Sequence, residues 1–186
     1  LLWVNDGTRD RIAANEQATL LQRLNEIVPP ESYNNSPQTD TVQVTAPAEL
    51  GTTQAVTVYL FRRDGQPVAA VLTVIAPDGY SGNIKLLVGV YYDGRVAGVR
   101  AVSHKETPGL GDYIETGRSD WILGFNGRSL VSPSPGDWRV KPDGGVFDAF
   151  TGATITPRAV VRAVYKSLLY FEREKTNLFT TDRVES

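Results

Sequence analysis

The sequence contains no cysteine, no methionine and only one histidine, His104. Without cysteine the chain has no thiolate ligands for an iron–sulfur cluster, no disulfide bonds and no cysteine nucleophile. A single histidine argues against a zinc or copper cage, and it excludes a haem held by two histidines. Any redox chemistry of this chain must therefore depend on an organic cofactor.

Long apolar runs and long basic runs are also missing. A membrane-spanning helix needs about 18 or more apolar residues in succession, so we expect no segment of this chain to span a bilayer. The chain has 19 basic and 21 acidic residues, a formal net charge of −2, which disfavours nucleic acid as a partner. Its 186 residues, 41% of them hydrophobic, are typical of one globular domain.

The chain begins with Leu-Leu-Trp-Val rather than with methionine. One interpretation is that a transmembrane helix or signal peptide precedes this point, with Trp3 near the membrane interface. The alternative is an arbitrary boundary. We divide the chain into an N-terminal helix and connection (1–40), a principal domain (41–176) and a polar tail (177–186).

Hydrophobic periodicity predicts two long helices, over residues 9–28 and 157–175. Five segments have the apolar patterns of strands: 41–46, 56–61, 68–75, 84–90 and 96–102. Asp-Gly pairs predict tight hairpins, residues 78–83 predict a loop, and short helices are expected over 110–117 and 120–125. The fold class is therefore α+β, with an antiparallel sheet of hairpins flanked by the N- and C-terminal helices.

Residues 148–154 read Asp-Ala-Phe-Thr-Gly-Ala-Thr and lead directly into the last predicted helix. Thr156 suits the N-cap of that helix, and Pro157 suits its first position. A helix N-terminus has unpaired N–H groups and can hold a phosphate, and small residues let an anion approach the backbone. From spacing alone, the segment is either an ordinary helix entrance or a phosphate site that includes Thr154.

The pattern Asp-x-x-Thr-Gly-Ala-Thr resembles the flavin-attachment motif of FMN-binding subunits in membrane ion-pumping redox complexes. The resemblance implies that Thr154 carries FMN through a phosphoester bond, with Thr151, Gly152 and Ala153 around the phosphate. Asp148 would help the modifying enzyme to recognise its target, or it is a simple turn residue. The domain over 41–176 would then be a single FMN-binding domain.

A second motif, His-Lys-Glu-Thr-Pro-Gly-Leu-Gly, occupies residues 104–111, directly after the last predicted strand. A backbone with few bulky side chains suits a flat ring, although the segment could equally be a tight turn. It resembles the other signature of the same family, which implies that these residues line the isoalloxazine ring: Glu106, Thr107, Gly109, Leu110 and Gly111. His104 is either a proton shuttle to the flavin or a hydrogen-bonded structural residue.

Other side chains have two interpretations each. Three basic residues are candidate phosphate neighbours or solvated charges: Lys141, Arg158 and Arg162. Four aromatic residues are candidates for stacking on the flavin or for the core: Tyr91, Tyr92, Trp121 and Phe147.

The sequence Thr-Gly-Ala-Thr-Ile-Thr-Pro is most similar to that of the G subunit of Rnf-type electron transport complexes. This resemblance implies an electron-transfer subunit without independent turnover, in a complex that couples ferredoxin:NAD electron flow to ion movement. It implies a bacterial inner membrane location, a domain facing the periplasm and a membrane anchor. A separate flavin transferase using FAD and Mg²⁺ would attach the FMN. The alternatives are a sodium-pumping NADH:quinone oxidoreductase C subunit, a non-covalent FMN-binding reductase or sensor, and a flavin-free periplasmic interaction module.

Overall fold

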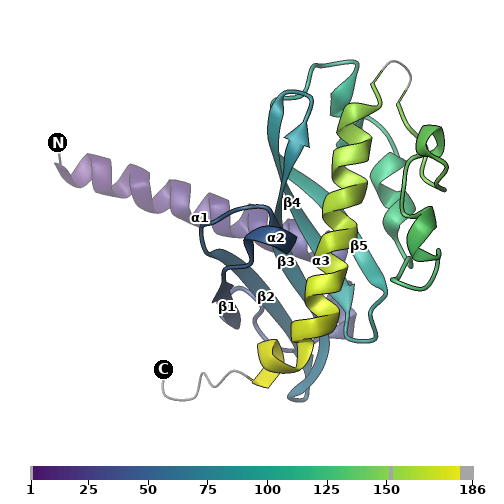
Figure 1. Ribbon diagram of the computed structural model, residues 1–186. Coiled ribbons are helices and arrows are strands. Elements are labelled where there is room, and N and C mark those ends of the chain that lie inside the picture. Colours follow the sequence, from purple (N-terminus) through teal and green to yellow (C-terminus); the bar gives the residue numbers. More distant parts are fainter. Residues whose placement is uncertain (1, 151–152, 181–186) are drawn as a thin grey trace.

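The protein is built around a five-stranded antiparallel sheet with the strand order β1-β2-β3-β4-β5 (Figure 1). The computed structural model describes residues 2–150 and 153–180, and side chains from residue 11 onward, except residue 13. The strands are β1 (Thr41–Val44), β2 (Val56–Arg63), β3 (Gln66–Gly79), β4 (Gly82–Tyr91) and β5 (Val96–Ser103). Each pairs with the next along the chain, as the predicted hairpins require. The predicted α+β class is confirmed.

Both faces of the sheet are apolar because each is covered by a helix. The helix α3 (Ile155–Thr180) packs on one face, where Leu72, Val88 and Val164 belong to one buried cluster. On the other face, the C-terminal part of α1 (Leu2–Ile27) packs through Leu24 and Ile27. The helix and the sheet are in close contact at Gly89. A Cβ at this position would lie 2.2 Å from Ile27 Cγ2, so the packing leaves no room for a side chain.

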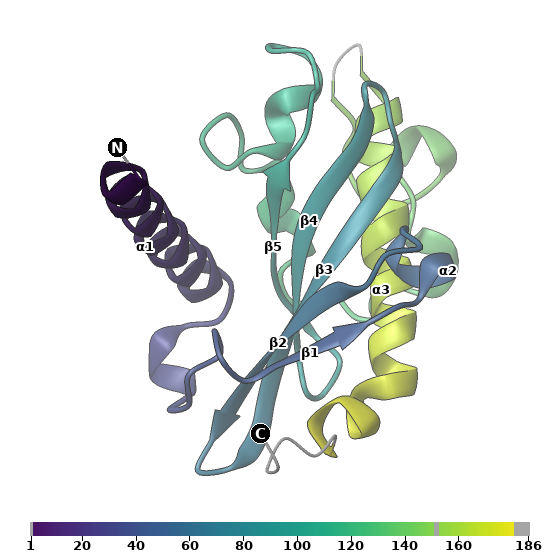
Figure 2. The ribbon, with the colours of Figure 1, turned by 90° about the vertical axis from the view of Figure 1, so that its left-hand side faces the viewer.

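The rest of α1 projects away from the sheet (Figures 1 and 2). Every described side chain from Arg11 to Thr19 is exposed, so this part of the helix has no core contact. The helix begins at Leu2, whereas periodicity predicted a start near residue 9. Among the described residues, no helix is both long and apolar enough to cross a membrane.

The hairpin between β3 and β4 is longer than predicted. The expected loop over 78–83 is wrong: β3 continues to Gly79, β4 begins at Gly82, and only Tyr80 and Ser81 form the turn. An irregularity between Ala76 and Gly79 shifts the register, which is why the alternating pattern ended early in the sequence. The extended hairpin brings its tip to the N-terminal end of α3 (Figure 1).

The segments between β5 and α3 contain short 3₁₀ helices. Two of them, Gly111–Ile114 and Trp121–Phe125, lie within the predicted short helices. Two more follow at Pro135–Asp137 and Lys141–Asp143, and another follows α1 at Pro30–Ser32. A one-turn helix, α2 (Pro47–Leu50), was not predicted; a segment of four residues is too short to show a helical period.

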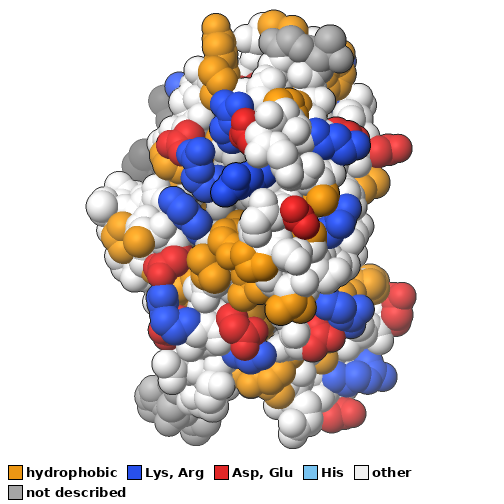
Figure 3. All heavy atoms as spheres, turned by 45° about the vertical axis from the view of Figure 1, so that its right-hand side comes forward, with side chains coloured by type: hydrophobic (Ala, Val, Ile, Leu, Met, Phe, Trp, Pro, Cys, Tyr) orange, Lys and Arg blue, Asp and Glu red, His pale blue; other side chains and the backbone are white. Residues whose placement is uncertain are grey.

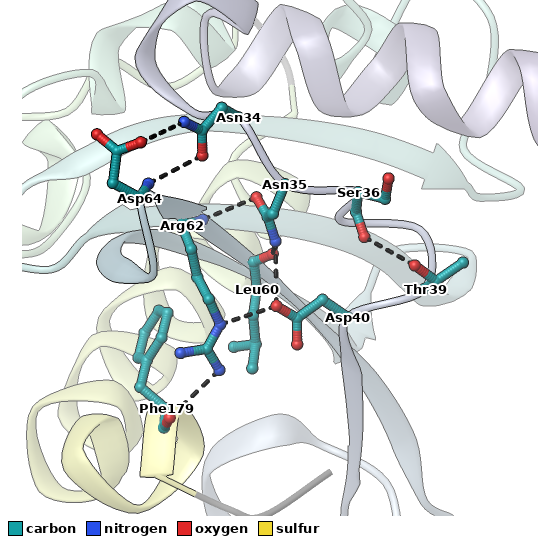
Figure 4. A network of polar contacts seen from close by, with 9 residues as sticks. All are labelled: Asn34, Asn35, Ser36, Thr39, Asp40, Leu60, Arg62, Asp64 and Phe179. Carbon is teal, nitrogen blue, oxygen red and sulfur yellow. Dashed lines mark hydrogen bonds and ion pairs between the residues drawn. The ribbon is translucent and has the colours of Figure 1, made fainter. Parts of the chain in front are cut away.

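The last helix continues to Thr180, beyond its predicted end near residue 175. Its final turn is held by Arg62 of β2, which donates from Nη2 to the Phe179 carbonyl (3.2 Å) and lies over the Phe179 ring (Figure 4). Arg62 Nε also pairs with Asp40 at 2.8 Å. These long-range contacts explain why residues at the start of the predicted polar tail belong to the helix.

Candidate functional site

The two sequence motifs meet in one cavity of about 220 Å³ at the N-terminal end of α3. It is lined by nine residues from three segments: Tyr80, Glu106, Thr107, Leu110, Gly111, Ala153, Thr154, Ile155 and Thr156. Tyr80 comes from the β3–β4 turn, the next four from the segment after β5, and the last four from the first two residues of α3 and the two residues before it. Thr151 and Gly152, the other predicted phosphate neighbours, lie outside the described residues.

Glu106 connects all three segments. Its side chain is buried, and Oε2 accepts a 2.9 Å hydrogen bond from the Ser81 N–H in the hairpin turn. Oε1 accepts a hydrogen bond from the buried Thr156 hydroxyl in α3. Both carboxyl oxygens are therefore engaged by the protein, so the geometry supports the role of holding the loop in shape.

Gly111 makes this arrangement possible. A Cβ at Gly111 would lie 2.8 Å from Glu106 Oε1 and 3.2 Å from Thr156 Oγ1. The first distance is too short for a carbon atom and the second is a tight contact, so any larger residue would displace the Glu106 carboxyl group. Gly111 is thus required by packing against Glu106.

The prediction that Thr156 is the N-cap of α3 is wrong. The helix begins at Ile155, so Thr154 occupies the preceding position, and its carbonyl accepts the Arg158 N–H at 3.1 Å. Thr156 instead directs its hydroxyl to Glu106. Pro157 is the third helical residue rather than the first, and it has no N–H to donate to a capping side chain. Among the described residues, the Thr154 hydroxyl has no hydrogen-bond partner, and it lines the cavity.

The Thr-Pro-Gly-Leu-Gly loop is stabilised by Asp112, a residue that the motif analysis did not select. The Thr107 carbonyl accepts the N–H groups of Leu110 and Gly111, at 3.0 and 3.1 Å. Asp112 is buried, accepts the Gly109 N–H at 2.8 Å and pairs with Arg118 at 3.0 Å. The local spacing Gly-x-x-Asp was the available signal, since a short acidic side chain commonly caps a turn. Leu110 remains 45% exposed, so the loop presents an apolar side chain at the cavity.

His104 is held by two protein contacts. Its Nδ1 accepts the Glu106 N–H at 3.1 Å, so the ring proton lies on Nε2, which donates to Glu115 Oε2 at 2.5 Å. His104 does not line the cavity; it lines a separate hollow of about 620 Å³ between α1 and the loop after β5. This geometry supports the structural interpretation of His104 over a proton shuttle.

Each of the three candidate phosphate neighbours is paired with a carboxylate. Lys141 pairs with Asp148 at 2.7 Å, and Arg158 forms a bidentate contact with Asp143 at 2.6 and 3.0 Å. The hydrogen bond from Arg158 lowers the pKa of Asp143 and raises the pKa of the guanidinium group. The third pair joins α3 to the β3–β4 hairpin through Arg162 and Asp78.

The four candidate stacking aromatics do not line this cavity. Phe147 stacks on Phe125 in the core at 4.9 Å. The Trp121 indole donates to the Asp148 carbonyl at 2.7 Å and lines a neighbouring hollow of about 560 Å³ with Gly109. Of the remaining two, Tyr91 is the last residue of β4, and Tyr92 follows it and contacts α3 through the Phe179 ring, with the ring centroids 5.4 Å apart.

Tyr80 is the aromatic residue that the sequence analysis missed. Its side chain is 72% exposed in the hairpin turn and lines the cavity, whose rim also includes the exposed side chains of Leu110 and Ile155. An exposed aromatic between Gly79 and Gly82 was the available signal, because a solvent-facing turn gives no packing reason for such a residue.

Comparisons with known proteins show the family of this chain. Residues 79–169 match the FMN-binding domain family, a range that contains both motifs and the hairpin turn. The chain is 51% identical over 174 residues to the G subunit of the ion-translocating oxidoreductase complex of Pseudoalteromonas atlantica, covering 94% of this chain and 81% of that protein. The chain belongs to this G-subunit family.

A second member, the G subunit of the corresponding complex of Pseudomonas aeruginosa strain UCBPP-PA14, is 49% identical over 179 residues, covering 96% of this chain and 84% of that protein. The fold is also similar to the crystal structure of Shewanella oneidensis NqrC, with a TM-score of 0.54 and 24% identity. That match covers 80% of this chain and 72% of the other. The resemblance inferred from the two motifs is thus confirmed, and the higher identities favour the G-subunit family.

Proposed function

We propose that this chain is the flavin-carrying electron-transfer subunit of an Rnf-type ion-translocating complex, with FMN attached to Thr154 by a phosphoester bond. The observation that carries the proposal is the position of the Thr154 hydroxyl. This hydroxyl lines the cavity where the two motifs meet, immediately before α3, and has no hydrogen-bond partner among the described residues. The nearby Thr156 hydroxyl is already bound to Glu106.

The residues around the cavity fit a flavin. The N-terminus of α3 presents the N–H groups of Ile155 and Thr156 beside Thr154, an arrangement that stabilises a phosphate. Tyr80, Leu110 and Ile155 offer apolar surface for a planar ring. The cavity is smaller than the roughly 300 Å³ that encloses a drug-sized ligand, so part of the cofactor would remain at the surface. That placement suits a cofactor that exchanges electrons with other proteins.

Attachment requires an activated donor, since a threonine hydroxyl does not react unaided. In the proposed step, Thr154 Oγ1 forms a bond to the FMN phosphorus of FAD, the diphosphate bond breaks and AMP leaves. The hydroxyl proton passes to a base of the flavin transferase, and Mg²⁺ neutralises the diphosphate charge. Asp148 is exposed and pairs only with Lys141 among the described residues, so its carboxylate is accessible for recognition by that enzyme.

Bound FMN supplies the electron chemistry, and the chain supplies attachment, burial and hydrogen bonds. Glu106, Gly111 and Thr156 fix the loop against α3, and Asp112 fixes the turn that carries Leu110. In our proposal the subunit has no turnover of its own. The relatives named as subunits of an ion-translocating complex support neighbouring subunits as its electron partners. The Rnf-type assembly, the ferredoxin:NAD reaction, the inner-membrane anchor and the periplasmic orientation are parts of the same proposal.

The test is the intact mass of the full-length protein coexpressed with its flavin transferase. We expect a mass increase of one FMN minus one water, which Thr154→Val abolishes. Thr151→Val is the matched control and keeps the adduct. An adduct that survives in Thr154→Val, or that is lost only in Thr151→Val, would refute the residue assignment. Flavin released entirely by acid denaturation would favour non-covalent binding, and a colourless protein would favour a flavin-free interaction module.

A further inference from the structure

A basic groove lies along α3, next to the cavity that contains Thr154. The groove has a volume of about 320 Å³ and lies between α3 and the loop over residues 138–143. Its apolar lining consists of Trp138, Val140, Val161 and Tyr165. Its charged lining consists of three arginines and one carboxylate: Arg139, Arg158, Arg162 and Asp143.

The positive charge continues along the exposed side of the helix. Arg158, Arg162 and Lys166 are spaced four residues apart, so they share one face of α3. Figure 3 shows Lys and Arg side chains gathering in the upper half of the face that carries the N-terminal part of α3. We call Arg139, Arg158, Arg162 and Lys166 the basic stripe.

Within the described part of the chain, carboxylates pair directly with only half of this stripe. Arg158 pairs with Asp143, and Arg162 pairs with Asp78. Arg139 and Lys166 are exposed and form no direct ion pair among the described residues, although the charge of Arg139 also helps to lower the pKa of Asp143. With four cations and two paired anions, the stripe has a local charge of +2, although the whole chain has a formal net charge of −2. The charge is therefore concentrated on one surface, which attracts an acidic partner.

The stripe also has a defined position relative to the proposed flavin. Arg158 is four residues after Thr154, one helical turn along α3. Arg162 is paired with Asp78, two residues from Tyr80 at the cavity rim. A protein that docks on the stripe would therefore cover a surface adjacent to the cavity. Exposed arginines beside Trp138 and Tyr165 match the composition of protein–protein interfaces, where arginine and aromatic residues are enriched.

We propose that the basic stripe docks an acidic face of the redox partner within the complex and so brings that partner beside the flavin. This inference rests on the proposed function for the identity of the partner. The chemistry that recognises the partner is direct pairing of its Asp and Glu side chains with Arg139 and Lys166, the two cations of the stripe that form no direct ion pair within the described part of the chain.

Carbodiimide cross-linking of the assembled complex tests the inference independently of flavin. The reagent joins an amine to a carboxyl group in direct contact with it, and peptide mass spectrometry identifies both residues. We expect a link between Lys166 and an acidic residue of another subunit. Lys166→Arg keeps the charge and should lose that link. The yield should fall with added salt, because a Debye length of about 10 Å at 0.1 M screens exposed pairs.

Two charge reversals of equal size, one inside and one outside the basic stripe, show whether the cross-link yield depends on the charge of the stripe. Arg139→Glu should lower the Lys166 cross-link yield about fivefold or more, since it places a carboxylate in the docking surface. Lys85→Glu is the matched control, because Lys85 is exposed on β4 and lines the groove between α1 and the sheet. That control should retain the yield within about twofold, as expected for a charge outside the contact.

Several outcomes would overturn the inference: no link from Lys166 to another subunit, an equal loss in Lys85→Glu, or a link formed only with the flavin transferase. Intact mass measured on the same samples separates the two proposals. A Lys166 link to another subunit with no FMN on Thr154 would support the docking surface and refute the covalent flavin. FMN on Thr154 with no such link would support the covalent flavin and refute the docking surface.

Discussion

Replacing Glu106 tests whether the site is organised by one buried carboxyl group. Glu106 is 5% exposed and accepts hydrogen bonds from the Ser81 N–H and from Thr156, which is 1% exposed. Glu106→Ala leaves both donors without their acceptor. An unsatisfied buried donor costs about 1–3 kcal/mol, so we expect the free energy of unfolding to fall by about 3 kcal/mol.

Glu106→Gln should cost much less, about 1 kcal/mol. The glutamine amide oxygen can accept the Ser81 N–H, while its NH₂ group donates to the Thr156 hydroxyl, which can act as an acceptor. Glu115→Ala is the matched control in the same segment. Its carboxylate is 47% exposed and pairs with His104, so its removal should cost less than about 1 kcal/mol.

Urea denaturation of the four proteins measures these differences, provided that the m-value is unchanged. Hydrogen exchange at the Ser81 amide gives a local readout, and exchange should accelerate in Glu106→Ala more than in Glu106→Gln. Thr156→Val combined with Glu106→Ala should cost less than the sum of the single changes, because both remove the same hydrogen bond. If Glu106→Ala is no more destabilising than Glu106→Gln, the carboxyl group does not hold these segments together.

Three further predictions concern other parts of the structure. Arg62→Met should lower the free energy of unfolding by about 2 kcal/mol in urea denaturation, because it removes two contacts of a charged group, the ion pair with Asp40 and the hydrogen bond to the Phe179 carbonyl; an unchanged midpoint would contradict this. Arg158→Gln should return the pKa of Asp143 toward its ordinary value in a carboxyl NMR titration. Because the folded-state pKa is lowered, this pair stabilises the protein above the ordinary aspartate range and loses its effect as the pH falls through the folded pKa; an Asp143 titration identical in both proteins would exclude the ion pair. In the flavinylated protein, Tyr80→Ala should change flavin fluorescence more than Trp121→Ala, since only Tyr80 lines the cavity of Thr154; the opposite order would place the ring in the hollow beside Trp121.

Local sequence patterns were sufficient to predict the sheet and most of both long helices. Alternating apolar residues gave the strands, and Asp-Gly turns gave their antiparallel order, because these signals depend only on neighbours in the sequence. The extended hairpin was missed because an irregularity before Gly79 interrupts the alternation. The last turn of α3 was missed because it depends on Arg62, which is 117 residues from Phe179 in the sequence.

The motifs identified the two segments of the candidate site, but they did not show how the segments fit together. Thr156-Pro157 has the form of an N-cap followed by a first helical residue, and local rules favour that assignment. The assignment fails because Glu106, 50 residues earlier in the chain, accepts the hydrogen bond from the Thr156 hydroxyl. Tyr80 was missed for a related reason, because the extended hairpin brings it to a cavity formed by two distant segments, whereas Asp112 makes only local contacts, with Gly109 and Arg118, and its Gly-x-x-Asp spacing was not used.

The same contact separates the two threonines chemically. Thr154 and Thr156 both lie at the start of α3 and both line the cavity, so position alone does not distinguish them. The buried hydroxyl of Thr156 is engaged with Glu106, and releasing it would leave a buried carboxyl oxygen without its donor. Modification of Thr156 would therefore disrupt the contact that joins the loop after β5 to the helix. Modification of Thr154 disrupts no described hydrogen bond of its side chain, so attachment at Thr154 is compatible with an intact site.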